Sequence, residues 1–199
     1  MSTKNSLKKY KEKRDFRKSP EPADGVRRRT PNKPIFVIQK HAARNLHYDF
    51  RLEVKGVLKS WAVPKGPSTN PRVKRAAFAV EDHPLSYAKF EGIIPKGEYG
   101  AGVVMVWDIG TYSNITEKDG KSIPIDQALK NGHASVKLNG KKLRGGFALT
   151  RVEKGEKERW LLIKMRDDDA DARRNPLKSE PNSALTGRTM KQIEHDEER

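Results

Sequence analysis

Three side chains that are suited to binding a metal ion lie close together in this sequence. His47 and Asp49 are two residues apart, and His41 comes shortly before them. Two imidazoles and one carboxylate form a ligand set suited to Mn²⁺, Fe²⁺, Co²⁺ or Zn²⁺, and such a set leaves open positions for water and substrate. The sequence therefore predicts a divalent metal site at His41, His47 and Asp49.

The segment 46–54 (LHYDFRLEV) carries two of these residues and alternates apolar and polar side chains, as a half-buried strand does. Alternate residues of a strand share a face, so we expect His47, Asp49 and Arg51 to point one way and the apolar side chains to point into the core. A short turn before the strand would bring His41 back beside them. Alternation alone is more typical of a strand with a plain solvated face, and the clustering of histidines is what favours a site.

A second group of reactive side chains lies in the segment 80–92 (VEDHPLSYAKFEG). The β-type run stops at Pro84, so His83 should sit at a strand end that opens onto a loop. A histidine there is placed for acid–base work, and we expect its protonated form to donate a proton to the leaving oxygen. A simple polar strand cap is the alternative for His83. Lys65 and Arg75 flank other predicted strands and are further candidates for phosphate contacts.

After a basic N-terminal stretch, the chain is a succession of short β-type runs separated by Gly, Pro and Asn. These runs are IFVIQ, LHYDFRLEV, VLKSWAV, AAFAVED, GVVMVWD, GTYSNI, ASVKL, GFALTRV and RWLLIKM. Helical patterns are confined to segments near 124–130 and 189–197, which disfavours a parallel βαβ sheet. We predict an all-β fold, as a single antiparallel barrel or sandwich over 35–166. A basic arm over 1–34 precedes it, and a polar tail over 167–199 follows it.

The charge balance favours a polyanionic partner. The chain has 42 Lys and Arg residues against 26 Asp and Glu, a formal net charge of +16, although a generally Lys-rich surface is the plainer alternative. The arm is too poor in large apolar residues to fold alone, so it is either a disordered tail or a segment that docks near the site. The absence of cysteine excludes thiolate ligands and thiol nucleophiles. With no recognisable signal peptide or membrane span, we expect a soluble cytoplasmic protein.

Three strings, HAARNLHYDFRLE, VEDHPLSYAKFEGIIPKGEYGAG and SWAVPKGP, closely resemble the 3′-phosphoesterase domain of bacterial DNA ligase D. The resemblance runs from about residue 14 to residue 166. It implies a compact β-barrel whose active site acts on 3′ ends at primer–template junctions. The implied metal ion is Mn²⁺, or another divalent ion such as Co²⁺. The implied steps are a phosphodiesterase cut, which removes a 3′-terminal ribonucleoside and leaves a 3′-phosphate, and a phosphomonoesterase cut, which leaves a 3′-hydroxyl.

The resemblance also carries functional residues over to this chain. The metal positions of the family match His41, His47 and Asp49. Its phosphate-binding and catalytic positions match Arg51, His83 and Tyr87, its secondary basic positions match Lys65 and Arg75, and functional positions in its arm match Arg14, Asp15 and Glu21. The match in the arm favours an arm that docks. The implied partners are nucleic acid 3′ ends in DNA repair by non-homologous end joining, with a separate DNA ligase and polymerase acting in trans.

Two other functions are compatible with the same residues. His47-x-Asp49 together with His41 copies the facial triad of non-haem iron oxygenases, although Arg51 and the net charge argue against that chemistry. The second is a nucleic-acid-binding accessory module, in which basic residues grip phosphates without catalysis. Oxygen-dependent turnover would identify the oxygenase, and binding that survives a chelator without cleavage would identify the accessory module.

Overall fold

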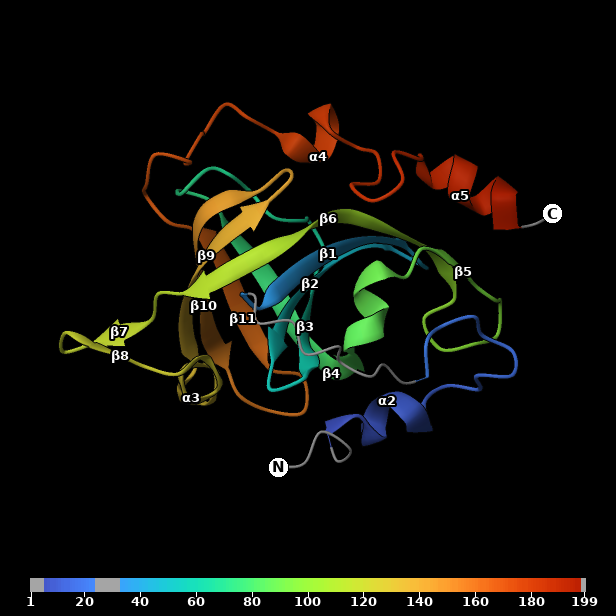
Figure 1. The fold of residues 1–199 in the computed structure, drawn as a ribbon, viewed down its shortest axis with the longest axis horizontal. Coiled ribbons are helices and arrows are strands. Elements are labelled where there is room, and N and C mark those ends of the chain that lie inside the picture. Colours follow the sequence, from blue (N-terminus) through green and yellow to red (C-terminus); the bar gives the residue numbers. More distant parts are fainter. Residues whose placement is uncertain (1–5, 24–32, 198–199) are drawn as a thin grey trace.

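The computed structural model describes residues 6–23 and 33–197, and strands form most of it (Figure 1). The strands of the main sheet are β1 (Ile35–Ala42), β2 (Leu46–Val54), β3 (Val57–Val63), β4 (Lys74–Pro84), β5 (Gly92–Ile94), β6 (Gly102–Asn114), β9 (His133–Gly140), β10 (Arg144–Glu153) and β11 (Arg159–Lys164). A small hairpin consists of β7 (Glu117–Lys118) and β8 (Lys121–Ser122). The helical segments are short: α2 (Lys8–Glu12), the 3₁₀ helix η1 (Leu85–Lys89), α3 (Ile125–Asn131), α4 (Pro176–Ser179) and α5 (Met190–Glu197). The predicted all-β fold is confirmed.

Eight strands of the main sheet close into an antiparallel barrel. Their order is β1-β2-β3-β4-β11-β10-β9-β6, and β6 pairs in turn with β1. The short strand β5 pairs with the first residues of β6. Closure gives every one of these eight strands a partner on both sides, which satisfies their backbone hydrogen bonds without a helix layer. Of the two predicted architectures, the structure is therefore the barrel.

One long strand replaces two that the sequence predicts. The runs GVVMVWD and GTYSNI are continuous in β6, and Gly110 lies inside this strand instead of in a turn. A Cβ atom at Gly110 would lie 2.1 Å from the Asn139 carbonyl oxygen of β9. The prediction of a break there is wrong, because the glycine is needed where two backbones approach each other closely.

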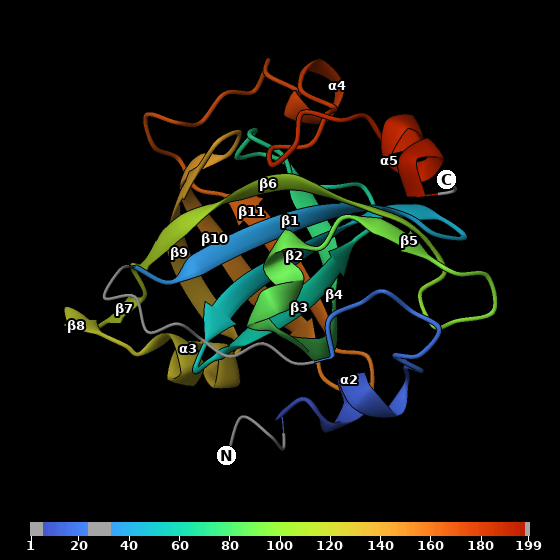
Figure 2. The ribbon, with the colours of Figure 1, turned by 45° about the vertical axis from the view of Figure 1, so that its right-hand side comes forward.

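Apolar side chains fill the barrel and also cover part of its outside. Phe50 and Trp61 belong to the buried cluster that fills the interior. The helix α2 lies outside the barrel (Figure 2). Tyr10 of α2 and Tyr87 of η1 belong to a second apolar cluster, together with Val37 of β1 and Leu58 of β3. The polar face of β2, represented by Arg51, is therefore buried under this cover. Charged groups there interact more strongly than they would in water.

The segments that precede and follow the barrel in the sequence both pack against it. In the arm, Tyr10 is fully buried. After β11, the chain runs back over the barrel, where the Trp107 indole donates a hydrogen bond to the Glu180 carbonyl at 2.9 Å and Ile193 is fully buried. The polar tail over 167–199 thus packs against the core through Glu180 and Ile193. Among the described residues, no helix has the length and apolar character needed to cross a bilayer.

Replacing Asp108 by alanine should destabilise the barrel strongly. Asp108 is fully buried in β6, and its carboxylate accepts hydrogen bonds from the backbone amides of Ile109, Lys141, Lys142 and Leu143 at 2.8–3.0 Å. Removal of this acceptor leaves buried N–H groups without a partner, and we expect the free energy of unfolding to fall by about 3 kcal/mol or more. Urea denaturation measures this loss. Asp126→Ala, which removes the exposed ion pair with Lys55, should have a much smaller effect.

Candidate metal centre and active site

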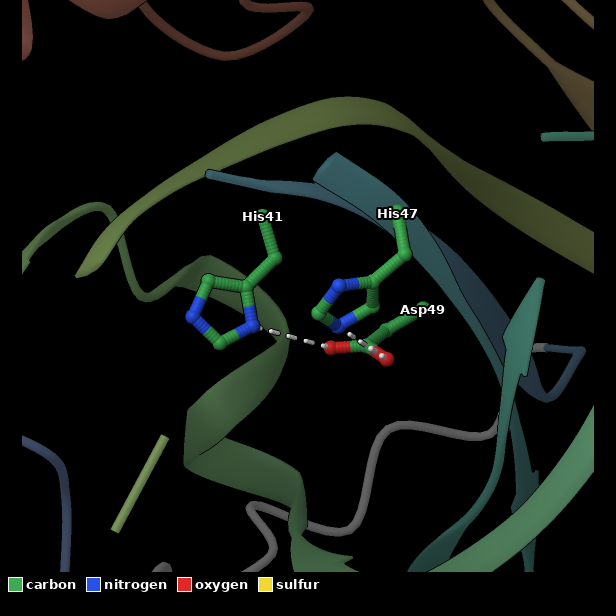
Figure 3. Close-up of side chains that lie close together, drawn as sticks. All are labelled: His41, His47 and Asp49. Atoms are coloured by element: carbon green, nitrogen blue, oxygen red, sulfur yellow. Dashed lines mark ion pairs between the residues drawn. The ribbon is translucent and has the colours of Figure 1, made fainter. Parts of the chain in front are cut away.

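The predicted metal residues lie together at one end of the β1–β2 hairpin (Figure 3). His41 in β1 pairs directly with His47 in β2, so their side chains share a face of the sheet. The carboxylate oxygens of Asp49 lie 3.8 Å from His41 Nδ1 and 3.6 Å from His47 Nε2. One ligand atom of each residue lies within 4.8 Å of the other two. This spacing is compatible with a shared divalent ion.

Hydrogen bonds to the backbone determine which nitrogen of each histidine is free. His41 Nε2 lies 2.8 Å from the Gly100 carbonyl oxygen, and His47 Nδ1 lies 2.9 Å from the Asn45 carbonyl oxygen. A carbonyl oxygen only accepts, so these two nitrogens carry the protons and donate. The unprotonated His41 Nδ1 and His47 Nε2 then face Asp49. Metal-binding histidines are typically oriented by such contacts of the other ring nitrogen, so this donor set fits a divalent metal.

Arg51 lies next to the metal residues on the same face of β2 and is only 2% exposed. It donates hydrogen bonds from Nη2 to Asp49 at 2.9 Å, from Nε to Gln39 at 2.8 Å and from Nη1 to Ser60 at 2.8 Å. Burial raises the pKa of Asp49, but the Arg51 charge opposes burial, and the pKa lies well below its usual value. Asp49 is therefore ionised and suited to binding a cation.

His83 lies between two guanidinium groups and is neutral. Its Nδ1 is 2.9 Å from Arg51 Nη1, and its Nε2 is 3.4 Å from Arg14 Nη2. Burial, followed by the charges of Arg51 and Arg14, lowers the pKa of His83 well below its usual value. These surroundings disfavour the protonated form, and the role of His83 as a donor to the leaving oxygen stays a prediction. His83 Nδ1 also lies 2.9 Å from the Glu81 carbonyl oxygen and donates to it, so Nε2 of the neutral ring is left to accept a hydrogen bond from Arg14.

The N-terminal arm brings two more predicted residues to this region. Arg14 donates from Nε to Glu21 at 2.9 Å and from Nη1 to Glu81 at 3.1 Å, and these three side chains are almost completely buried. The Tyr87 hydroxyl donates to the same Glu21 oxygen at 2.9 Å. Glu21 thus ties the arm to η1, and Arg14 ties it to β4. Of the two alternatives for the arm, the described part is the docked one, and it covers His83.

Three predicted residues are not brought into this network. The Asp15 carboxylate accepts hydrogen bonds from Arg17, its neighbour in the arm, at 3.0 Å. Lys65 is exposed in the turn after β3. Arg75 pairs with the core residue Leu162, and its buried Nε has no hydrogen-bond partner in the described part of the chain. Within that part, none of the three has a hydrogen bond or ion pair with the metal residues, and their functional roles stay predictions.

Three residues that hold this network together are not predicted from the sequence. Gln39 and Ser60, on the strands that flank β2, accept hydrogen bonds from Arg51, and Glu81 accepts one from Arg14. Gln39 is the polar residue of the apolar run IFVIQ, and Ser60 stands next to the single lysine of the apolar run VLKSWAV. A buried polar side chain must find a partner. A polar residue inside an apolar strand was therefore the available signal.

The sequence of this chain matches a known protein family and several known proteins. The family model for the DNA ligase D 3′-phosphoesterase domain matches residues 39–151. A multifunctional non-homologous end joining protein LigD of Pseudomonas aeruginosa is 45% identical over 194 residues, which cover 96% of this chain and 22% of that protein. A multifunctional non-homologous end joining DNA repair protein LigD of Mycobacterium tuberculosis is 45% identical over 161 residues, which cover 81% of this chain and 20% of that protein.

The chain therefore spans about a fifth of the length of these relatives. The stretch that the family model matches begins in β1 and ends in β10, so it includes the strands that carry all three metal residues. It also extends over more than half of the chain. On this sequence match, the chain belongs to the DNA ligase D 3′-phosphoesterase domain family.

Proposed function

We propose that this chain is a metal-dependent 3′-phosphoesterase that heals nucleic acid ends in DNA repair by end joining. In the first step, water attacks the phosphorus of the last internucleotide linkage, the bond to the 5′ oxygen of the terminal ribonucleoside breaks, and a 3′-phosphate remains. In the second step, water attacks this phosphate, the bond to the 3′ oxygen breaks, and inorganic phosphate leaves. The 3′-hydroxyl that results is the end that a DNA ligase or polymerase requires.

The observation that supports this proposal best is the convergence of His41 Nδ1, His47 Nε2 and the ionised Asp49 carboxylate beside Arg51. This nitrogen and oxygen set suits Mn²⁺, with Co²⁺ as an alternative. When bound, a divalent ion supplies Lewis acidity toward a phosphate oxygen and lowers the pKa of a water molecule. Membership of the phosphoesterase family favours this chemistry over that of an iron oxygenase.

The protein's own residues would orient the phosphate and meet its charge. Among the described contacts, Arg51 donates hydrogen bonds to Asp49, Gln39 and Ser60, and one N–H on Nη2 is left for a phosphate oxygen. Because these contacts hold the guanidinium in place, its charge can stabilise the developing negative charge without rearrangement. The second guanidinium, that of Arg14, lies behind His83 and adds positive potential.

A primer–template with a single 3′-terminal ribonucleotide and a 5′ label tests the proposed function. With Mn²⁺, we expect the primer to shorten first to a 3′-phosphate end and then to a 3′-hydroxyl end. A chelator should stop both steps, and His47→Ala should stop them in the presence of Mn²⁺. Gel separation at single-nucleotide resolution distinguishes the two products. Primer binding without cleavage under any divalent metal would instead identify a nucleic-acid-binding accessory module.

A further inference from the structure

Exposed aromatic rings are confined to the surroundings of the metal residues. The chain has 6 Phe, 3 Trp and 5 Tyr residues, all within the described ranges. Of these, Phe78 at 36% and Tyr99 at 47% are the exposed ones, and the others are buried or half-buried. Nucleic-acid-binding proteins use exposed aromatic side chains as platforms on which bases stack.

Phe78 lies on the same outer face of the sheet as Asp49. In the strand register, Asp49 of β2 is opposite Ala62 of β3, and Ala62 is opposite Phe78 of β4. Residues directly opposite each other share a face, and neighbouring strands are about 4.8 Å apart. Phe78 is thus about 10 Å from Asp49 across the sheet. In this row of opposite residues, Ala62 is the residue between them.

Tyr99 lies on the opposite side of the metal residues. It belongs to the loop between β5 and β6, and the next residue, Gly100, accepts the hydrogen bond from His41 Nε2 at 2.8 Å. The strand order β6-β1-β2-β3-β4 places this loop beyond His41 and places Phe78 beyond Asp49. The Tyr99 hydroxyl lies 3.1 Å from Lys13 Nζ of the arm, and Figure 2 shows the arm beside this loop. Lys13 and Arg14 also lie over the Tyr99 ring, 4.5 Å and 5.3 Å from its centroid, so a base would stack on ring surface that these cations leave open.

We propose that Phe78 and Tyr99 are stacking platforms for the two nucleosides that flank the scissile phosphate, an inference that rests on the proposed function. The Phe78 side is an open strand face with exposed cations, Lys65 after β3 and Lys74 at the start of β4, so it suits the continuing upstream strand. The Tyr99 side is bounded by the arm through Lys13, so it suits the single terminal ribonucleoside.

The roles of Phe78 and Tyr99 can be distinguished by comparing the two cleavage steps. Both nucleosides are present in the first step, whereas the upstream nucleoside alone remains in the second. Phe78→Ala should therefore raise KM about 5-fold to 100-fold for substrates of both steps, the range expected from the loss of one base-stacking contact. Tyr99→Ala should raise KM for the first step by a similar factor and leave the second step unchanged.

Matched variants control for folding and for general loss of apolar surface. Phe78→Tyr and Tyr99→Phe retain a ring and should keep KM within about 3-fold of the unaltered protein, well below the effect of losing a stacked base. Ile115→Ala removes a side chain of similar exposure, 38%, at the far end of β6 and should have no effect. The inference is overturned if the unaltered protein cleaves and neither alanine variant changes KM, or if the two variants exchange their step dependence.

A binding measurement in chelator tests the same inference without catalysis. The base analogue 2-aminopurine, which loses fluorescence when it stacks, is placed either in the terminal ribonucleoside or in the nucleoside before it. We expect quenching at the upstream position to be lost in Phe78→Ala only, and quenching at the terminal position to be lost in Tyr99→Ala only. Position-specific quenching in a protein that never cleaves would reject the proposed function, although it would still show that the two rings stack on neighbouring nucleosides. Quenching that neither variant alters would reject the inference.

Discussion

Asp49→Asn should lower kcat for both cleavage steps by about 10³-fold or more. The substitution keeps the size of the side chain and one oxygen, but it removes the negative charge that faces His41 and His47. Divalent metals contribute several kcal/mol of transition-state stabilisation in hydrolytic sites, and each 1.4 kcal/mol or so is a factor of ten in rate. A weaker and displaced metal ion should forfeit most of that contribution.

Two measurements distinguish weaker metal binding from a slower cleavage step at saturating metal. Calorimetric titration with Mn²⁺ should show weaker binding to Asp49→Asn, and single-turnover assays at saturating Mn²⁺ should still show slow cleavage. Asp126→Asn is the matched control, since its half-buried carboxylate pairs with Lys55 and is not one of the metal residues. A rate within about 10-fold of the unaltered protein, with unchanged Mn²⁺ affinity, would show that Asp49 is not a metal ligand.

The local part of the site was predictable because it depends on the pleat of a single hairpin. Alternation in LHYDFRLEV determines that His47, Asp49 and Arg51 share a face, and this holds in any antiparallel fold. The approach of His41 follows from the short connection between β1 and β2, which pairs it with His47. The barrel itself follows from many short strands separated by turn residues.

The electrostatic state of the site was not predictable, because it depends on segments that are distant in sequence. Arg14 comes from the arm, and it contacts His83 although 69 positions separate the two residues in the sequence. Tyr10 and Tyr87 bury the polar face of the strand, which a strand pattern alone assigns to solvent. Burial and two guanidinium charges then keep His83 neutral, whereas an isolated histidine at a strand end would be a plausible acid.

Arg51→Ala should lower kcat by about 10²-fold or more while Mn²⁺ still binds, because a preorganised donor to developing charge is worth that much in comparable sites. The same change removes a buried partner from Asp49, Gln39 and Ser60. Breaking a buried ion pair typically costs about 3–5 kcal/mol of stability. Circular dichroism and Mn²⁺ titration are therefore needed to show that the variant is folded and loaded before its rate is interpreted.

Arg51→Lys distinguishes the geometry of the guanidinium from its charge. A lysine keeps the positive charge beside Asp49, but its single ammonium group cannot reach Gln39, Ser60 and Asp49 in the fixed directions of a guanidinium. We therefore expect Arg51→Lys to bind Mn²⁺ and to remain at least about 10-fold slower than the unaltered protein. Full activity in Arg51→Lys would show that charge alone suffices, and full activity in Arg51→Ala would show that Arg51 does not act on the phosphate. An Arg51→Lys rate between those of the unaltered protein and Arg51→Ala would show that the hydrogen bonds that hold the guanidinium in place contribute to the cleavage rate.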